Sequence, residues 1–113
     1  MRGPRSRPAA SPPRSLTDPV RAIADLAEEE LGLVATGRYD ELNALHVRRD
    51  AALAALPATP SAAEREVLAR AHHVQVQVTA LLERALGETS AHLTRLDRGQ
   101  AALRGYARAL KGA

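Results

Sequence analysis

The apolar positions of residues 18–35 recur every three or four residues, which is the spacing of one face of an α-helix. That face consists of Val20, Ile23, Leu26 or Ala27, Leu31 and Val34. The acidic run at 28–30 falls largely off this face, so we expect it to lie in solvent. Asp18 and Pro19 form a favourable helix start after Thr17, and Gly37 ends the helix as a left-handed cap.

A second amphipathic helix is predicted over about residues 38–56. Its apolar stripe, in which Arg49 contributes its aliphatic stem, consists of Leu42, Leu45, Arg49, Ala52, Leu53 and Leu56. Pro57 and Pro60 stop this helix. Ser61 and Glu64 form an S-x-x-E capping box, so a third helix is expected to begin at Ala62.

A long apolar seam follows, because no proline interrupts the chain after Pro60. Steps of three and four dominate this seam, which consists of Val67, Ala71, Val74, Val78, Leu81 or Leu82, Ala85 or Leu86, Leu93, Leu96, Leu103, Tyr106 and Leu110. As one unbroken helix it would extend roughly 70 Å. Each glycine costs about 1 kcal/mol relative to alanine, so a break is expected at Gly87 or Gly99. We favour Gly99, with residues 100–110 as a separate last helix.

These elements predict an all-α fold, namely an antiparallel three- to four-helix bundle or hairpin with one long C-terminal helical segment. The first two helices, each roughly 27 Å long, are too short to cover the whole seam. Part of the seam is therefore expected to remain exposed. An exposed apolar strip on a helical protein usually serves a partner or self-association.

Composition agrees with a helical core and removes several kinds of chemistry. The chain has 24 Ala and 16 Leu, its only aromatic residues are Tyr39 and Tyr106, and it has no Phe, Trp or Cys. Strands favour β-branched and aromatic residues, so this composition favours helices. Without cysteine there is no disulfide, thiolate metal site or thiol nucleophile.

The positive charge belongs almost entirely to one end of the chain. The formal net charge is +3, but residues 1–16 carry four arginines, four prolines and no acid, which leaves the other 97 residues at −1. We predict a disordered leader over 1–16 and a helical domain over 17–110. A phosphate-binding arm is the alternative for the leader, although no aromatic residue is present there to stack on bases.

No segment is suited to crossing or entering a membrane. The chain has no run of 18 apolar residues, and no apolar core follows the leading arginines as it would in a signal peptide. The sequence therefore predicts a cytoplasmic protein without membrane insertion.

The titratable residues form no recognisable catalytic or metal-binding motif. The imidazoles are those of His46, His72, His73 and His92, and we expect them at the surface or the core boundary. His72 and His73 point about 100° apart on a helix, so they do not chelate one ion together. Arg48 and Arg49 could hold an anion, as buried arginines do in helical chorismate mutases, but that pattern also needs a lysine, and Lys111 is the only one. We expect no enzyme activity, metal or cofactor.

The junction between the first two helices carries a family resemblance. Residues 37–42, Gly-Arg-Tyr-Asp-Glu-Leu, fit the pattern G-x-[WY]-[DE]-x-L, and Leu45, Arg49 and Leu53 fit the helix that follows it. Residues 103–106, Leu-Arg-Gly-Tyr, are similar to an aromatic-bearing last helix. In these features, which extend over about residues 20–108, the chain resembles the flagellar export chaperones of the FliT/FlgN class.

The resemblance implies a small all-α chaperone that binds the C-terminal helical end of an exported axial protein, either a filament cap or a hook–filament junction protein. It would prevent premature assembly and deliver the client to the export gate or to the ATPase complex. The implied partner-binding residues are Val74, Val78, Leu81, Leu82 and Leu86 in the client groove and Tyr106 at the export gate. On this interpretation, L82D would preserve helicity and abolish client binding, whereas unfolding would place Leu82 in the core.

Two other functions remain open at this point. The seam could pair with itself in a coiled-coil adaptor or homodimer. Less favoured is nucleic-acid binding through the basic leader.

Overall fold

The computed structural model describes residues 16–87 and 90–111, with the side chains of 90–92 left out. Within these residues the chain forms four α-helices, one short 3₁₀ helix and no strand. The elements are α1 (Asp18–Ala35), η3 (Tyr39–Glu41), α2 (Leu42–Ala54), α3 (Ala62–Leu86) and α4 (Ser90–Lys111). The predicted all-α bundle is confirmed. Residues 1–15 of the predicted leader (1–16) lie outside the described residues.

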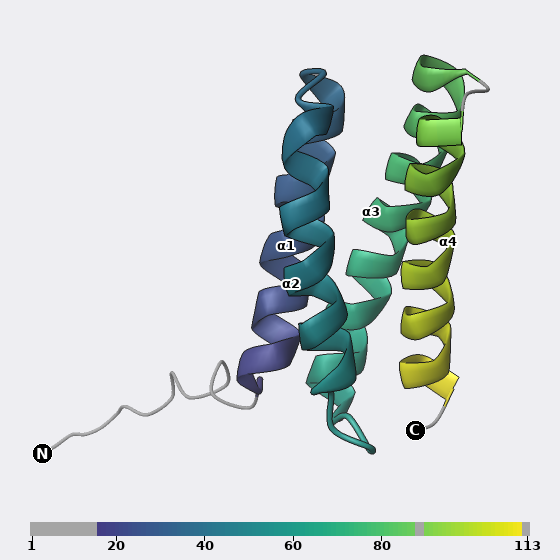
Figure 1. Ribbon diagram of the computed structural model, residues 1–113. Coiled ribbons are helices and arrows are strands. Elements are labelled where there is room, and N and C mark those ends of the chain that lie inside the picture. Colours follow the sequence, from purple (N-terminus) through teal and green to yellow (C-terminus); the bar gives the residue numbers. More distant parts are fainter. Residues whose placement is uncertain (1–15, 88–89, 112–113) are drawn as a thin grey trace, which may run out of the picture.

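The helices form two antiparallel hairpins, α1 with α2 and α3 with α4 (Figure 1). α1 packs against both α2 and α3, and α3 also packs against α4. α2 and α4 contact each other less extensively than these three pairs do. The bundle is therefore closed on its α1–α3 side and least tightly packed on its α2–α4 side.

The glutamate of the capping box joins the starts of two helices. Ser61 and Glu64 exchange the two expected hydrogen bonds, with the Glu64 N–H donating to Ser61 Oγ at 3.1 Å and the Ser61 N–H donating to Glu64 Oε1 at 3.0 Å. The other carboxylate oxygen of Glu64 accepts from both the N–H and the hydroxyl of Thr17, each at 2.8 Å. Hydrogen bonds from the Ser61 and Thr17 backbones lower the pKa of Glu64. One carboxylate thus fixes the beginning of α1 beside the beginning of α3.

The break in the long C-terminal segment lies at Gly87, so the predicted break at Gly99 is wrong. α3 ends at Leu86, and Gly87 adopts a φ of 69°, which favours glycine. Gly99 lies inside α4, where a Cβ atom would come within 2.9 Å of Thr79 Oγ1. Gly99 therefore permits close packing of α4 on α3, and residues 100–110 are the second half of one helix.

Substitution of Gly87 by alanine tests this assignment. The φ of 69° and ψ of −155° at Gly87 fall in a region used essentially by glycine, so G87A should lower the free energy of unfolding by about 1–3 kcal/mol. Gly32 is exposed within α1, and a Cβ there meets nothing within 4 Å. G32A should therefore raise the stability by up to about 1 kcal/mol. Urea denaturation measures both variants, and equal changes in the same direction would contradict the assignment.

The apolar core consists of two clusters stacked along the bundle. The lower cluster lies toward the end of the bundle where α1 begins. It draws on all four helices and consists of Val20, Ile23, Ala27, Ala52, Leu68, Ala71, Ala102 and Tyr106. The upper cluster draws its buried residues from three helices and consists of Leu26, Leu33, Val34, Leu42, Leu45, Val78, Leu82 and Leu86. From α4, Leu96 packs against the upper cluster and is only partly buried.

Candidate functional site

The residues expected to form a client groove lie mostly inside the core. Val78, Leu82 and Tyr106 are 0% exposed and Leu86 is 7% exposed, so the prediction that they lie on an open seam is wrong. Val74 and Leu81 are half-buried. The seam closes because the chain turns back at Gly87 and because α1 packs along α3.

Tyr106 is separated from the other predicted partner-binding residues. It belongs to the lower cluster, whereas Val78, Leu82 and Leu86 belong to the upper one. Its ring meets that of His72 edge-on, with the centroids 6.3 Å apart. Burial raises the pKa of the Tyr106 phenol to about 12, and its hydroxyl has no hydrogen-bond partner among the described residues. In this conformation, Tyr106 is a core residue and offers no surface to a partner.

The predicted junction between the first two helices forms a 3₁₀ turn. Gly37 has a φ of 73°, as expected for the residue that ends α1. Arg38 donates to both carboxylate oxygens of Glu41, at 2.7 and 2.9 Å. The half-buried Tyr39 packs against the upper cluster, and the Arg95 guanidinium of α4 lies 5.9 Å from its ring centroid. The turn therefore connects the α1–α2 hairpin to α4 at the upper end of the bundle.

A buried polar cluster links all four helices, and sequence reasoning missed it. Its members are Glu30, His46, Arg49 and Gln75, each at most 1% exposed. The Glu30 carboxylate pairs with Arg49 and lies 2.7 Å from His46 Nε2. Arg49 donates to Gln75 Oε1 at 2.7 Å and, more weakly, to the Arg98 carbonyl oxygen at 3.5 Å. The negative charge of Glu30 on α1 and the positive charge of Arg49 on α2 thus neutralise each other inside the bundle.

Two expectations are corrected by this cluster. Glu30 was expected in solvent with the rest of the acidic run, and His46 was expected at the surface or the core boundary, but both are buried. Their helical spacing contains the missing signal. Glu30 is three or four residues from Ala27, Leu33 and Val34, and His46 is four residues from Leu42 and three from Arg49, so each shares a helix face with buried residues.

The polar cluster is closed to a substrate in this conformation. Glu30, Arg49 and Gln75 are completely covered, and both oxygens of Glu30 are engaged. On α2 and α3 the cluster lies between residues of the lower and the upper apolar cluster. Within the described residues, no three His, Asp or Glu side chains are grouped so as to hold a metal ion. The arrangement suits a structural polar layer better than a reaction site.

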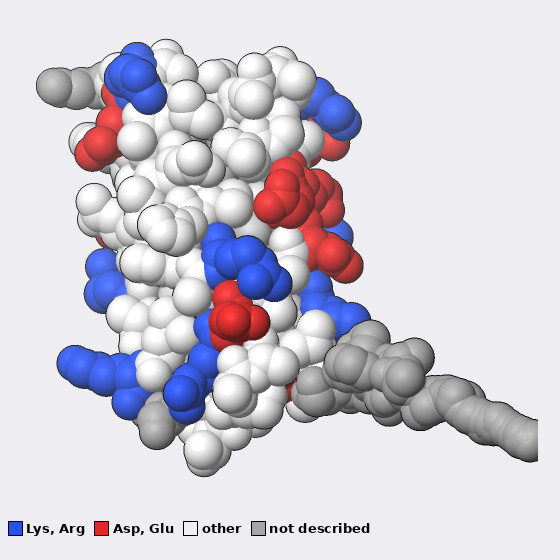
Figure 2. Space-filling model, turned by 180° about the vertical axis from the view of Figure 1, so that it is seen from behind, with Lys and Arg blue, Asp and Glu red and all other residues white. Residues whose placement is uncertain are grey.

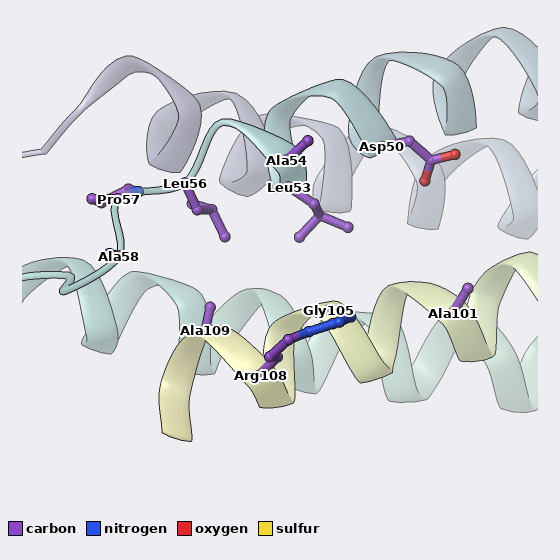
Figure 3. A pocket seen from close by; sticks show the side chains of 10 residues that line it. All are labelled: Asp50, Leu53, Ala54, Leu56, Pro57, Ala58, Ala101, Gly105, Arg108 and Ala109. Atoms are coloured by element: carbon purple, nitrogen blue, oxygen red, sulfur yellow. The ribbon is translucent and has the colours of Figure 1, made fainter. Parts of the chain in front are cut away.

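The strongest candidate site is an open groove on the α2–α4 side. It has a volume of about 550 Å³ and lies between the end of α2, the loop after it and the second half of α4. Its lining residues are Asp50, Leu53, Ala54, Leu56, Pro57, Ala58, Ala101, Gly105, Arg108 and Ala109 (Figure 3). We call this surface the α2–α4 groove.

The shape of the α2–α4 groove follows from small residues at regular spacing. Ala101, Gly105 and Ala109 recur every four residues and form one face of α4. Opposite them, Leu53 and Leu56 project from α2 and its following loop (Figure 3). A Cβ atom on Gly105 would come within 3.1 Å of Leu53 Cδ1. Because glycine has no side chain, Leu53 can pack closely against α4 at this position. The result is an apolar surface with room for a bulky partner side chain.

Comparison with family models, curated proteins and solved structures finds no match to this chain. In the described part of the chain, no helix is both long enough and apolar enough to span a membrane.

Proposed function

We propose that this protein is a flagellar export chaperone that holds an amphipathic helix of its client in the α2–α4 groove. The observation that carries the proposal is an apolar groove on the side where the bundle is least tightly packed. Apolar grooves between helices are a common docking place for amphipathic helices. The resemblance of residues 37–42 to the junction of the FliT/FlgN class supports the choice of family. The groove is a binding surface consistent with that choice.

The dimensions of the groove fit a short helical contact. Residues 101–109 of α4 extend about 12 Å along the helix, which corresponds to roughly two turns of a partner helix. Such a partner would place two or three large apolar side chains against Leu53, Leu56 and the small residues of α4. A client end held in this way would have its own apolar face covered and would be withheld from assembly.

A binding role without catalysis is part of the proposal. Glu30 and His46 are the buried residues suited to acid–base chemistry, but Glu30 pairs with Arg49 and His46 lies against the same carboxylate, so both belong to the core. The α2–α4 groove itself carries only Asp50 and Arg108 as charged residues.

A groove-filling substitution tests the proposal. Ala101 is exposed and lines the groove, so A101W should fill the space and weaken client binding at least about tenfold, the equivalent of about 1.4 kcal/mol. Calorimetry with the C-terminal segments of flagellar axial proteins from the same genome measures the effect. Ala107 is also exposed on α4 but does not line the groove, so A107W serves as the matched control.

The same experiment separates the alternatives. Absence of binding to every axial segment by the folded protein would refute the chaperone proposal. Concentration-dependent dimerisation that A101W abolishes, observed by sedimentation, would instead favour a homodimer formed through this groove.

A further inference from the structure

The helices of the bundle carry very different charges. α1 contains five acidic residues and one arginine, whereas α4 contains five basic residues and one aspartate, so their formal charges are −4 and +4. In the view from behind, acidic side chains gather toward the edge formed by α1 (Figure 2). The α2–α4 groove lies on the other side of the bundle, where α4 forms one of its walls.

The second half of α4 carries three basic residues, one of which lines the groove. Arg104, Arg108 and Lys111 are spaced by four and three residues, so they share one face of the helix with Ala101, and all three are exposed. Arg108 lines the groove, and its side chain extends along α4 toward Gly105 (Figure 3). None of the three takes part in an ion pair with another described residue. Their charges are therefore available to a partner.

The wall of the groove formed by α2 carries a negative charge. Asp50 projects from α2 at the edge of the groove and also forms no ion pair within the described residues (Figure 3). A helix in the groove would have one flank beside Asp50 and the other beside Arg108. Charges on the two flanks of a helix set partner choice and orientation in helix pairs, because a helix turned end for end exchanges its flanks.

From this arrangement we infer that the α2–α4 groove selects an amphipathic helix with a bulky apolar face and an acidic flank that lies against α4. A smaller basic flank, facing Asp50, fixes the direction of the helix. This inference rests on the proposed function for the location of the groove, and it adds the chemistry of the partner. Attraction between the acidic flank and α4 also makes the binding dependent on salt.

Two synthetic peptides test the inference with the full-length chain. Both have about 18 residues and the same Leu/Ala apolar face, but one carries Glu and the other Lys at the flanking positions. We expect the Glu peptide to bind roughly fivefold to tenfold more tightly at low salt, and this difference to shrink at high salt.

Charge-reversal variants show whether α4 is responsible. R108E should weaken binding of the Glu peptide by roughly fivefold. Arg70 is exposed on the α1–α3 side and does not line the groove, so R70E makes the same change in net charge and should leave binding unaffected. A101W should abolish binding of either peptide.

The possible outcomes separate the two proposals. If both peptides bind equally and A101W abolishes both, the groove is correct and the acidic preference is refuted. If neither peptide binds the folded protein, the groove proposal and the acidic preference fail together. If R108E and R70E weaken binding equally, or if A101W has no effect, the attraction is a non-specific effect of surface charge and the inference is refuted. Tighter binding of a DNA duplex than of the Glu peptide would also overturn it.

Discussion

Replacement of Glu30 by glutamine should lower the free energy of unfolding by about 3–5 kcal/mol, because it leaves Arg49 as an uncompensated charge in the core. The same change removes the carboxylate that lies against His46. A small domain has only about 5–15 kcal/mol of stability in total, so E30Q should be close to unfolding at room temperature. Urea denaturation followed by circular dichroism measures the effect.

The neighbouring glutamate provides the control. Glu29 is exposed and pairs with Arg48 at 3.0 Å, so E29Q should cost less than about 1 kcal/mol. The double variant E30M/R49M removes both buried charges and should recover most of the stability lost in E30Q. Equal costs for E30Q and E29Q would show that Glu30 is not buried against Arg49.

Introduction of aspartate at Leu82 should unfold the protein. Leu82 is completely buried in the upper cluster, so L82D both removes a core side chain and buries a charge. Leucine-to-alanine changes in cores already cost about 2–5 kcal/mol, and the charge adds to that cost. Loss of helical circular dichroism and of the thermal transition is the expected result.

Leu93 on α4 provides a matched control, since it is 56% exposed. L93D should change stability by less than about 0.5 kcal/mol. Retention of full helicity in L82D would contradict the burial of Leu82 in the core. It would instead favour the prediction that Leu82 lies on an exposed client-binding seam.

Local signals in the sequence predicted the helices well. The apolar spacing, the Ser61–Glu64 capping box and the glycine at residue 37 each act within one or two helical turns, and the structure has these features in place. The second helix is shorter than expected, because its first residues form the separate 3₁₀ turn η3. The all-α class followed directly from these local features.

Features that depend on neighbouring helices were not predicted. Gly87 and Gly99 have the same intrinsic cost within a helix, and only the proximity of Thr79 distinguishes Gly99 as a packing position. Glu30 resembles its exposed neighbours in sequence, and its burial depends on Arg49 and His46 from another helix. The α2–α4 groove likewise depends on how far apart two helices lie that are distant in sequence.

The error in the client groove has the same origin. The prediction that α1 and α2 could not cover the seam placed the favoured break at Gly99, so that one helix would run from Ala62 almost to that glycine. Once the chain turns back at Gly87, the second half of the seam packs onto the first, and α1 covers the residues that remain between them. The exposed apolar surface lies instead between α2 and α4, which contact each other less extensively than the pairs α1–α2, α1–α3 and α3–α4 do.

The two-hairpin architecture makes the protein cooperative. Each apolar cluster contains buried residues from both hairpins, so neither hairpin possesses a complete core of its own. The buried cluster of Glu30, Arg49 and Gln75 joins the same two halves. Loss of the contact between α1 and α3 would leave both hairpins with unpaired apolar faces and would break the hydrogen bond from Arg49 to Gln75. We therefore expect folding and unfolding to be all-or-none transitions of the whole domain, without a stable half-folded form.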